Sequence, residues 1–146
     1  MVGLGLMGHG IAQTAASAGF DVVALDANPQ GLESGMKRIE GSLGKLLGRS
    51  VKKGALTQQQ ADEQAAAALA RITPTTDIQA LADCDLVIEA IVENVDVKKE
   101  FYANLGKVAK PSAILASNTS SSAPTPRTPR SSKPASSGCW TLANTP

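Results

Sequence analysis

The 146-residue chain has little of several residue types, and each shortage excludes a class of protein. Aromatic residues make up only 3% of the chain, so aliphatic side chains must form its core. The two cysteines, Cys84 and Cys139, are too few for a disulfide framework and match no CxxC metal spacing. We therefore expect plain thiols, no metal site and a reducing, cytoplasmic setting.

Long apolar runs and an excess of one charge are also absent. No segment approaches the roughly 18 apolar residues of a membrane span, so we expect no membrane contact. The formal net charge of +1 leaves no basic stripe that would attract a nucleic-acid backbone. Residues 1–5 lack the basic and apolar regions of a secretory signal.

The charged residues that are present are unevenly spread. All 13 Asp and Glu residues lie before position 123, whereas residues 123–146 carry Arg127, Arg130 and Lys133 with most of the 8 prolines. The apolar residues of this tail follow neither helical nor strand spacing. Its composition allows too little apolar burial to offset the conformational entropy that ordering would cost. We predict a folded domain over residues 1–122 and a disordered, Pro/Ser/Arg-rich tail over residues 123–146.

Residues 1–122 alternate between segments typical of helices and segments typical of buried strands. Helical patterns cover about residues 11–18, 30–53, 57–70 and 97–110, with one further turn at 77–81. Apolar, β-branched runs that indicate strands cover residues 21–26, 72–76, 85–92 and 113–117. This alternation predicts an α/β fold, a Rossmann-type doubly wound parallel sheet.

A glycine-rich loop opens the chain with the G-x-G-x-x-G pattern over residues 3–8. Its glycines permit a tight turn, close backbone approach to a pyrophosphate and close packing of the following helix. Asp26 ends the next strand, near the place about 20 residues on where the fingerprint expects an acid for the ribose hydroxyls. A carboxylate there repels a 2′-phosphate, so the pattern predicts NAD rather than NADP. The alternative is a structural turn followed by an unrelated acid.

Only Met1 and Val2 precede this loop, although such a loop normally follows a strand of about 5–6 residues. We therefore expect the domain to lack most of its first, central strand and to be poorly stable. His9 is the only histidine and follows the last glycine of the loop. No partner that would orient it as a base is evident, so we interpret it as an ordinary helix residue.

Four stretches resemble the NAD-binding domain of the 3-hydroxyacyl-CoA dehydrogenase family, which includes the 3-hydroxybutyryl-CoA dehydrogenases. They are residues 3–12 (GLGLMGHGIA), Arg71-Ile72 with Thr75-Thr76-Asp77, residues 83–93 (DCDLVIEAIVE) and residues 117–121 (SNTSS). The likeness covers residues 1 to about 122. It implies NAD-dependent oxidation of an (S)-3-hydroxyacyl-CoA to a 3-oxoacyl-CoA in fatty-acid or butanoate metabolism, by a homodimeric enzyme.

The resemblance also implies roles for individual residues. The residues that would hold NAD are Gly3, Leu4, Gly5, Leu6, Met7, Gly8 and Asp26, with Glu93 and Lys98 at its nicotinamide half. Ser120 matches an active-site serine near substrate and nicotinamide, and Ser42 and Arg49 match positions that touch coenzyme A. The alternatives are an ordinary loop serine at position 120 and a solvated helix start at positions 93 and 98.

The sequence departs from the family at its catalytic base. The reaction needs a group that takes the hydroxyl proton, and the family uses a histidine oriented by a glutamate. Here His9 is the only histidine and no acid follows Glu100. We therefore expect this chain alone not to turn over, and expect the catalytic histidine, its glutamate and the helical substrate and dimerisation domain to be missing.

Three hypotheses stay open beside that expectation. The tail could reflect a shifted reading frame, because the composition changes abruptly after the Ser-Asn-Thr-Ser-Ser segment. The chain could be a non-catalytic nucleotide-binding or degenerate protein. It could also belong to a dehydrogenase that acts on a related 3-hydroxy acid without coenzyme A.

Overall fold

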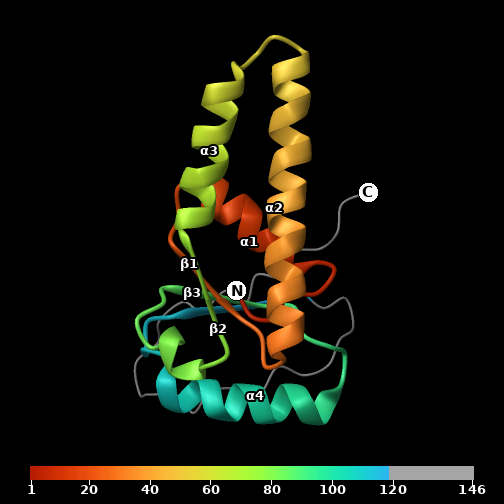
Figure 1. The fold of residues 1–146 in the computed structure, drawn as a ribbon. Coiled ribbons are helices and arrows are strands. Elements are labelled where there is room, and N and C mark those ends of the chain that lie inside the picture. Colours follow the sequence, from red (N-terminus) through yellow and green to blue (C-terminus); the bar gives the residue numbers. More distant parts are fainter. Residues whose placement is uncertain (119–146) are drawn as a thin grey trace.

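The computed structural model describes residues 1–118, in which helices alternate with short strands (Figure 1). The helices are α1 (Gly8–Ser17), α2 (Pro29–Lys52), α3 (Gln58–Ala70), the 3-10 helix η1 (Ile78–Leu81) and α4 (Val95–Val108). The strands are β1 (Val22–Leu25), β2 (Ile72–Thr75), β3 (Leu86–Glu89) and β4 (Ile114–Ser117). The predicted tail, 123–146, and the predicted active-site serine, Ser120, lie outside the described residues.

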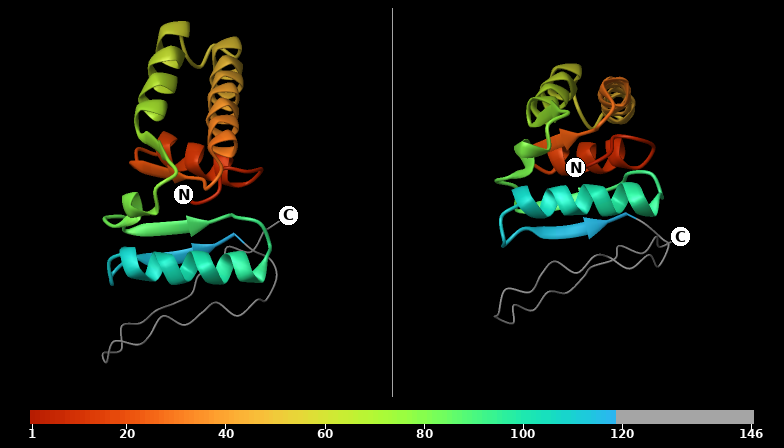
Figure 2. Two further views of the ribbon diagram at one scale, coloured as in Figure 1. Left: turned by 60° about the horizontal axis from the view of Figure 1, so that its bottom comes forward. Right: turned by 90° about the horizontal axis from the view of Figure 1, so that it is seen from below.

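The strands form two parallel pairs, and Val2 lies between them. β1 pairs with β2, and β3 pairs with β4, whose ribbons run side by side in Figure 2. Val2 forms parallel bridges to both Leu25 and Glu89. Its N–H donates to the Ile88 carbonyl over 2.9 Å, and its carbonyl accepts from Ala90 over 2.8 Å. The order across the sheet is therefore β2-β1-Val2-β3-β4.

Helices cover both faces of this sheet, as a doubly wound fold requires. In Figure 1 the sheet lies between α4 below and α1 with the α2–α3 pair above. Side chains that alternate along a strand point to opposite faces. Accordingly Val22 and Ala24 belong to one apolar cluster, while Val23 and Leu25 belong to the other. The first cluster draws Ala12, Ala16, Ile39, Leu43 and Ala68 from the upper helices, and the second draws Leu81 and Leu105 from η1 and α4.

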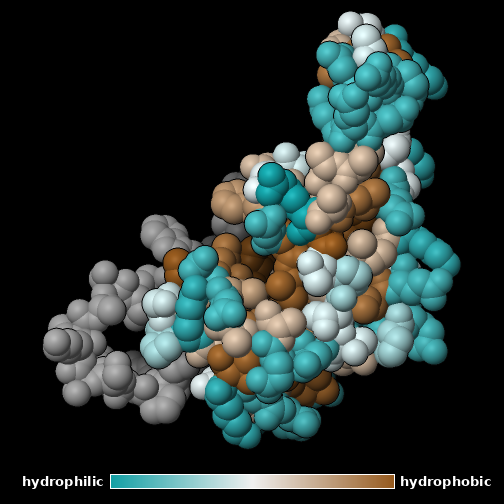
Figure 3. All heavy atoms as spheres, turned by 60° about the vertical axis from the view of Figure 1, so that its left-hand side comes forward, coloured by the Kyte–Doolittle hydropathy of each residue, from teal (hydrophilic) through white to brown (hydrophobic). Residues whose placement is uncertain are grey.

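The α2–α3 pair projects from the body of the domain (Figure 1). Ile39 and Leu43 are its deeply buried apolar residues on α2, and both lie before the end that projects. The projecting end is largely hydrophilic on the face that Figure 3 shows, while apolar side chains gather over the body. Among residues 1–118, no helix combines the length and the apolar character that crossing a membrane requires.

Local signals account for the observed element boundaries. The predicted capping box is present: the Thr57 hydroxyl accepts from the Gln60 N–H over 3.2 Å, and the Gln60 side chain accepts from the Thr57 N–H over 2.9 Å. α4 begins earlier than the apolar spacing predicted, because the Asn94 side chain caps the Asp96 and Val97 N–H groups. β3 is shorter than the predicted strand, because the Ile91 N–H turns back to the Glu89 carboxylate.

Candidate functional site

The glycine loop is packed tightly at two of its three glycines. Gly3 has a φ of +81°, which a residue with a side chain rarely adopts. A Cβ at Gly8 would lie 1.7 Å from the Gly3 carbonyl oxygen, so only glycine lets α1 begin this close to the loop. Gly5 instead faces open space, with nothing within 4 Å of a Cβ built there. The loop thus leaves backbone exposed at its second glycine, where the motif expects a pyrophosphate.

The first turn of α1 has the properties of an anion site. Met7 is the N-cap residue and makes no side-chain hydrogen bond to the helix start. The first N–H groups of a helix have no intrahelical acceptor, and the helix dipole places partial positive charge there. Leu6 and Met7 are exposed, so the loop is accessible from solvent. The arrangement fits a diphosphate held by backbone N–H groups.

Asp26 lies beside this loop at the carboxyl end of β1. Its Oδ2 accepts a hydrogen bond from the Leu4 N–H over 2.9 Å, and its Oδ1 accepts from the Asn28 N–H over 3.0 Å. A Cβ on Gly31 would come within 3.1 Å of Oδ1, so the start of α2 packs closely on the carboxylate. The acid predicted from spacing is therefore also a structural tie between β1 and the loop.

Glu89 ends β3 and forms a buried polar cluster that the sequence reasoning missed. Its side chain is 1% exposed. Oε1 accepts from the Ile91 N–H over 2.8 Å, while Oε2 accepts from the Ser117 hydroxyl over 2.8 Å and the Tyr102 hydroxyl over 3.2 Å. The available signal was an acid inside an otherwise apolar strand, because such a position requires polar partners.

Lys98 completes this cluster, which we call the Glu89 cluster (Glu89, Lys98, Tyr102 and Ser117). Its Nζ lies 3.2 Å from Glu89 Oε2, and its side chain is only 13% exposed. A solvated helix start is therefore the wrong interpretation for Lys98, whereas Glu93 is exposed. The cluster lies at the carboxyl edge of the sheet, where open α/β sheets bind ligands.

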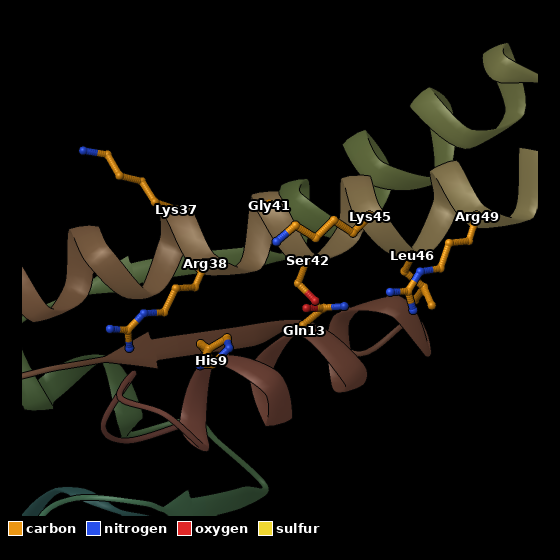
Figure 4. Close-up of a pocket in the computed structure, with 9 residues that line it drawn as sticks. All are labelled: His9, Gln13, Lys37, Arg38, Gly41, Ser42, Lys45, Leu46 and Arg49. Atoms are coloured by element: carbon orange, nitrogen blue, oxygen red, sulfur yellow. The ribbon is translucent and has the colours of Figure 1, made fainter. Parts of the chain in front are cut away.

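Ser42 and Arg49 lie together on a basic groove between α1 and α2 (Figure 4). The groove has a volume of about 620 Å³ and is lined by His9, Gln13, Lys37, Arg38, Gly41, Ser42, Lys45, Leu46 and Arg49. In Figure 4 the Ser42 side chain points toward Gln13, across from α2. Arg38, Ser42, Lys45 and Arg49 fall at helical spacing on α2, a signal that could have placed all four on one face.

Two groove residues are engaged elsewhere. The Lys37 ammonium donates to the Glu33 carboxylate over 2.6 Å, and this hydrogen bond raises the pKa of Lys37 and lowers that of Glu33. His9 Nδ1 lies 2.7 Å from the Gly5 carbonyl oxygen, so its ring also contacts the glycine loop. Arg38, Lys45 and Arg49 supply the remaining positive charge of the groove.

Comparison with known proteins decides which family this geometry represents. A family model described as 3-hydroxyacyl-CoA dehydrogenase, NAD binding domain, matches residues 1–136. The chain belongs to this family. It is 50% identical over 121 residues to a probable 3-hydroxybutyryl-CoA dehydrogenase of Deinococcus radiodurans, covering 83% of this chain and 40% of that protein. A 3-hydroxybutyryl-CoA dehydrogenase of Bradyrhizobium diazoefficiens is 46% identical over 121 residues, which cover 83% of this chain and 39% of that protein.

Solved structures of the 3-hydroxyacyl-CoA dehydrogenase family share the fold. The (S)-3-hydroxybutyryl-CoA dehydrogenase of Ralstonia eutropha matches with a TM-score of 0.70 and 38% identity, over 82% of this chain and 40% of that one. The 3-hydroxybutyryl-CoA dehydrogenase of Escherichia coli matches with a TM-score of 0.67 and 40% identity, over 83% of this chain and 24% of that one. The chain thus spans about 40% or less of these relatives.

The family confirms NAD as the cofactor of this domain, because the matching family model is its NAD-binding domain. The residues present fit that group. Gly5 leaves space for close approach, the α1 N-terminus has no side-chain cap, and Asp26 stands beside the loop. The Rossmann-type fold predicted from the sequence is likewise confirmed.

Proposed function

We propose that this chain is the NAD-binding part of an enzyme that oxidises an (S)-3-hydroxyacyl-CoA, such as 3-hydroxybutyryl-CoA, to the 3-oxoacyl-CoA. The family match over residues 1–136 is the observation that carries this proposal. The relatives named 3-hydroxybutyryl-CoA dehydrogenase support the substrate class. We assign the reaction to fatty-acid or butanoate metabolism in the cytoplasm. The complete enzyme would be a homodimer, without membrane or nucleic-acid partners.

In this proposal the glycine loop and Asp26 hold NAD, which accepts a hydride when bound. Backbone N–H groups around Gly5 and at the start of α1 donate to the pyrophosphate. Asp26 keeps lone pairs beyond its two hydrogen bonds and accepts from the ribose hydroxyls. Its negative charge repels the 2′-phosphate of NADP. Lys98 and Glu93 contact the nicotinamide half.

The groove between α1 and α2 takes the coenzyme A moiety. Arg38, Lys45 and Arg49 provide positive charge for its phosphates, and Ser42 provides a hydroxyl. Leu46 is exposed within the same groove and offers an apolar contact. Ser120 is the active-site serine of the proposal, near substrate and nicotinamide.

The chain supplies binding groups but no base of the kind the reaction needs. His9, its only histidine, bonds the glycine loop, and no acid follows Glu100. We therefore propose that residues 1–146 bind NAD without catalysing oxidation, because proton removal requires a group from elsewhere.

Calorimetric titration of the full 146-residue chain with NADH, NADPH and coenzyme A tests the proposal. We expect NADH to bind at least about tenfold more tightly than NADPH, because Asp26 repels the additional phosphate. Coenzyme A should bind independently of NADH. In a parallel assay with NADH and acetoacetyl-CoA we expect no oxidation of NADH. Absence of NADH binding, or equal affinity for NADPH, would overturn the cofactor assignment.

A further inference from the structure

Glu89 is the charged side chain that residues 1–118 bury most completely, at 1% exposure. Burying a carboxylate is costly unless its charge is compensated and its oxygens accept hydrogen bonds. Here both oxygens accept bonds from the protein, and the Lys98 ammonium supplies the compensating charge at 3.2 Å. The sequence thus places an ion pair inside the sheet, at a position where an apolar residue would pack without the cost of removing a charge from water.

The partners of Glu89 come from three separate elements. Ile91 belongs to the turn after β3, Tyr102 and Lys98 to α4, and Ser117 to the end of β4. The Glu89 backbone carbonyl also accepts from the Asn118 N–H over 2.7 Å. One residue therefore links β3, β4 and α4 at the carboxyl edge of the sheet. This edge is the side on which such sheets bind ligands.

We propose that Glu89 is a positioning residue that holds the Lys98 ammonium in place for the nicotinamide half of NAD. The inference rests on the proposed function, which assigns Lys98 to that half of the cofactor. A lysine has a flexible four-carbon stem and loses much entropy when it is fixed. Glu89 fixes it in advance: the stem is largely buried and the ammonium is paired. Binding then does not incur the cost of ordering this side chain.

A comparison of two ligands separates positioning from a general structural role. ADP-ribose contains the adenosine, pyrophosphate and second ribose of NADH but lacks the nicotinamide. We expect Glu89→Gln in the full 146-residue chain to weaken NADH binding about five- to tenfold and to leave ADP-ribose binding unchanged. A merely structural defect would weaken both ligands equally, because both use the glycine loop and Asp26.

Lys98→Met and the double variant Glu89→Gln with Lys98→Met complete the cycle. If Glu89 acts through Lys98, Lys98→Met lowers the NADH to ADP-ribose affinity ratio by the same factor. Glu89→Gln then has no further effect on that ratio in the Lys98→Met background. Tyr102→Phe is the matched control, since it removes one hydrogen bond to Glu89 Oε2 and leaves the Glu89–Lys98 pair intact. The NADH to ADP-ribose affinity ratio of Tyr102→Phe should stay within about twofold of the ratio of the parent chain.

Glu89→Asp keeps the proposal testable where Glu89→Gln fails to fold. It retains the charge but draws the ion pair back by one methylene, so the affinity ratio should again fall. An unchanged NADH to ADP-ribose affinity ratio in whichever of the two variants folds would overturn the proposal. The proposal would also be overturned if this ratio were much lower in the double variant than in Lys98→Met. If the parent binds neither NADH nor ADP-ribose, the proposed function itself is wrong. Parent binding with an unchanged ratio refutes only the role of Glu89.

Discussion

The backbone N–H of Leu4 donates a hydrogen bond to the Asp26 carboxylate over 2.9 Å, which ties the glycine loop to the end of β1. The two residues are separated by 22 positions in the chain. Asp26 also accepts from the Asn28 N–H, so one carboxylate orders the loop and the turn that leads into α2. A residue that the motif assigns to cofactor binding therefore also orders the glycine loop through the protein's own hydrogen bonds.

Replacement of Asp26 should therefore destabilise the domain. Asp26→Ala leaves the Leu4 and Asn28 N–H groups without this acceptor, and we expect a loss of about 1–3 kcal/mol in the free energy of unfolding. Urea denaturation measures it. Asp21→Ala is the control, because Asp21 pairs with Arg71 at an exposed position and should cost less than about 1 kcal/mol. Equal losses in the two variants would contradict a structural role for Asp26.

Two glycines of α1 should respond oppositely to alanine. At Gly8 a Cβ would lie 1.7 Å from the Gly3 carbonyl oxygen, so Gly8→Ala must displace the loop or the helix. We expect a loss of about 3 kcal/mol in the free energy of unfolding, together with loss of NADH binding. Gly10→Ala meets nothing within 4 Å and should stabilise the helix by about 0.5–1 kcal/mol. Thermal denaturation and NADH titration of both variants check this, and a tolerated Gly8→Ala would contradict it.

A chain that begins at Met1 places its α-amino group inside the sheet, where it donates to the Val23 carbonyl over 2.7 Å. Burial lowers the pKa of this group below its ordinary value of 8.0, and the smaller electrostatic effect of the nearby Cys84 opposes that shift. The folded state therefore binds this proton less readily than the unfolded chain. The stability contributed by the neutral amine is present above pH 8.0 and is lost as the pH falls from 8.0 to the lowered pKa.

Urea midpoints measured between about pH 6 and pH 9 test this linkage. The midpoint should rise with pH across that window in the free-amine chain. Acetylation of the α-amino group removes the titrating charge, so the acetylated chain should lose this component of the rise. Identical slopes for the two chains would show that the α-amino group does not titrate as inferred.

The groove between α1 and α2 should discriminate between coenzyme A and NAD. The double variant Ser42→Ala with Arg49→Met removes a hydroxyl and a charge from its lining, and we expect coenzyme A affinity to fall about tenfold. NADH affinity should stay unchanged. Lys53→Met is the matched control, since Lys53 is exposed at the end of α2 and outside the groove. Calorimetry provides both affinities, and an equal effect of Lys53→Met would indicate nonspecific attraction only.

Much of the fold was predictable because its signals are local. The Thr57–Gln60 capping box and the apolar run around Val87 each depend on neighbours within a few positions. The glycine loop was predictable for the same reason, since Gly3 and Gly8 each meet a steric requirement within the loop and the adjoining start of α1. The bridges of Val2 to Leu25 and Glu89 could not be predicted in this way, because they join segments that are distant in the chain.

The candidate site was predicted only in part, because its remaining contacts join distant segments. Lys98 is a surface residue by its charge alone, and its burial follows from the carboxylate at the end of β3. The hydroxyl of Ser117 reaches that carboxylate across 28 positions of the chain, which requires the parallel pairing of β3 with β4. Helical spacing could have placed Arg38 beside Ser42. That this face opposes His9 and Gln13 depends on how α1 packs against α2.

The sequence by itself determined where most helices and strands form, which loop carries the G-x-G-x-x-G motif and which family the residues resemble, because periodicity and turn chemistry act over short distances. Tertiary structure decided that Val2 bridges both strand pairs, and that the Asp26 carboxylate is hydrogen-bonded to the glycine loop. It also decided that Glu89 and Lys98 form a buried pair. Those contacts depend on sheet register and helix packing, which only the complete arrangement of the chain defines.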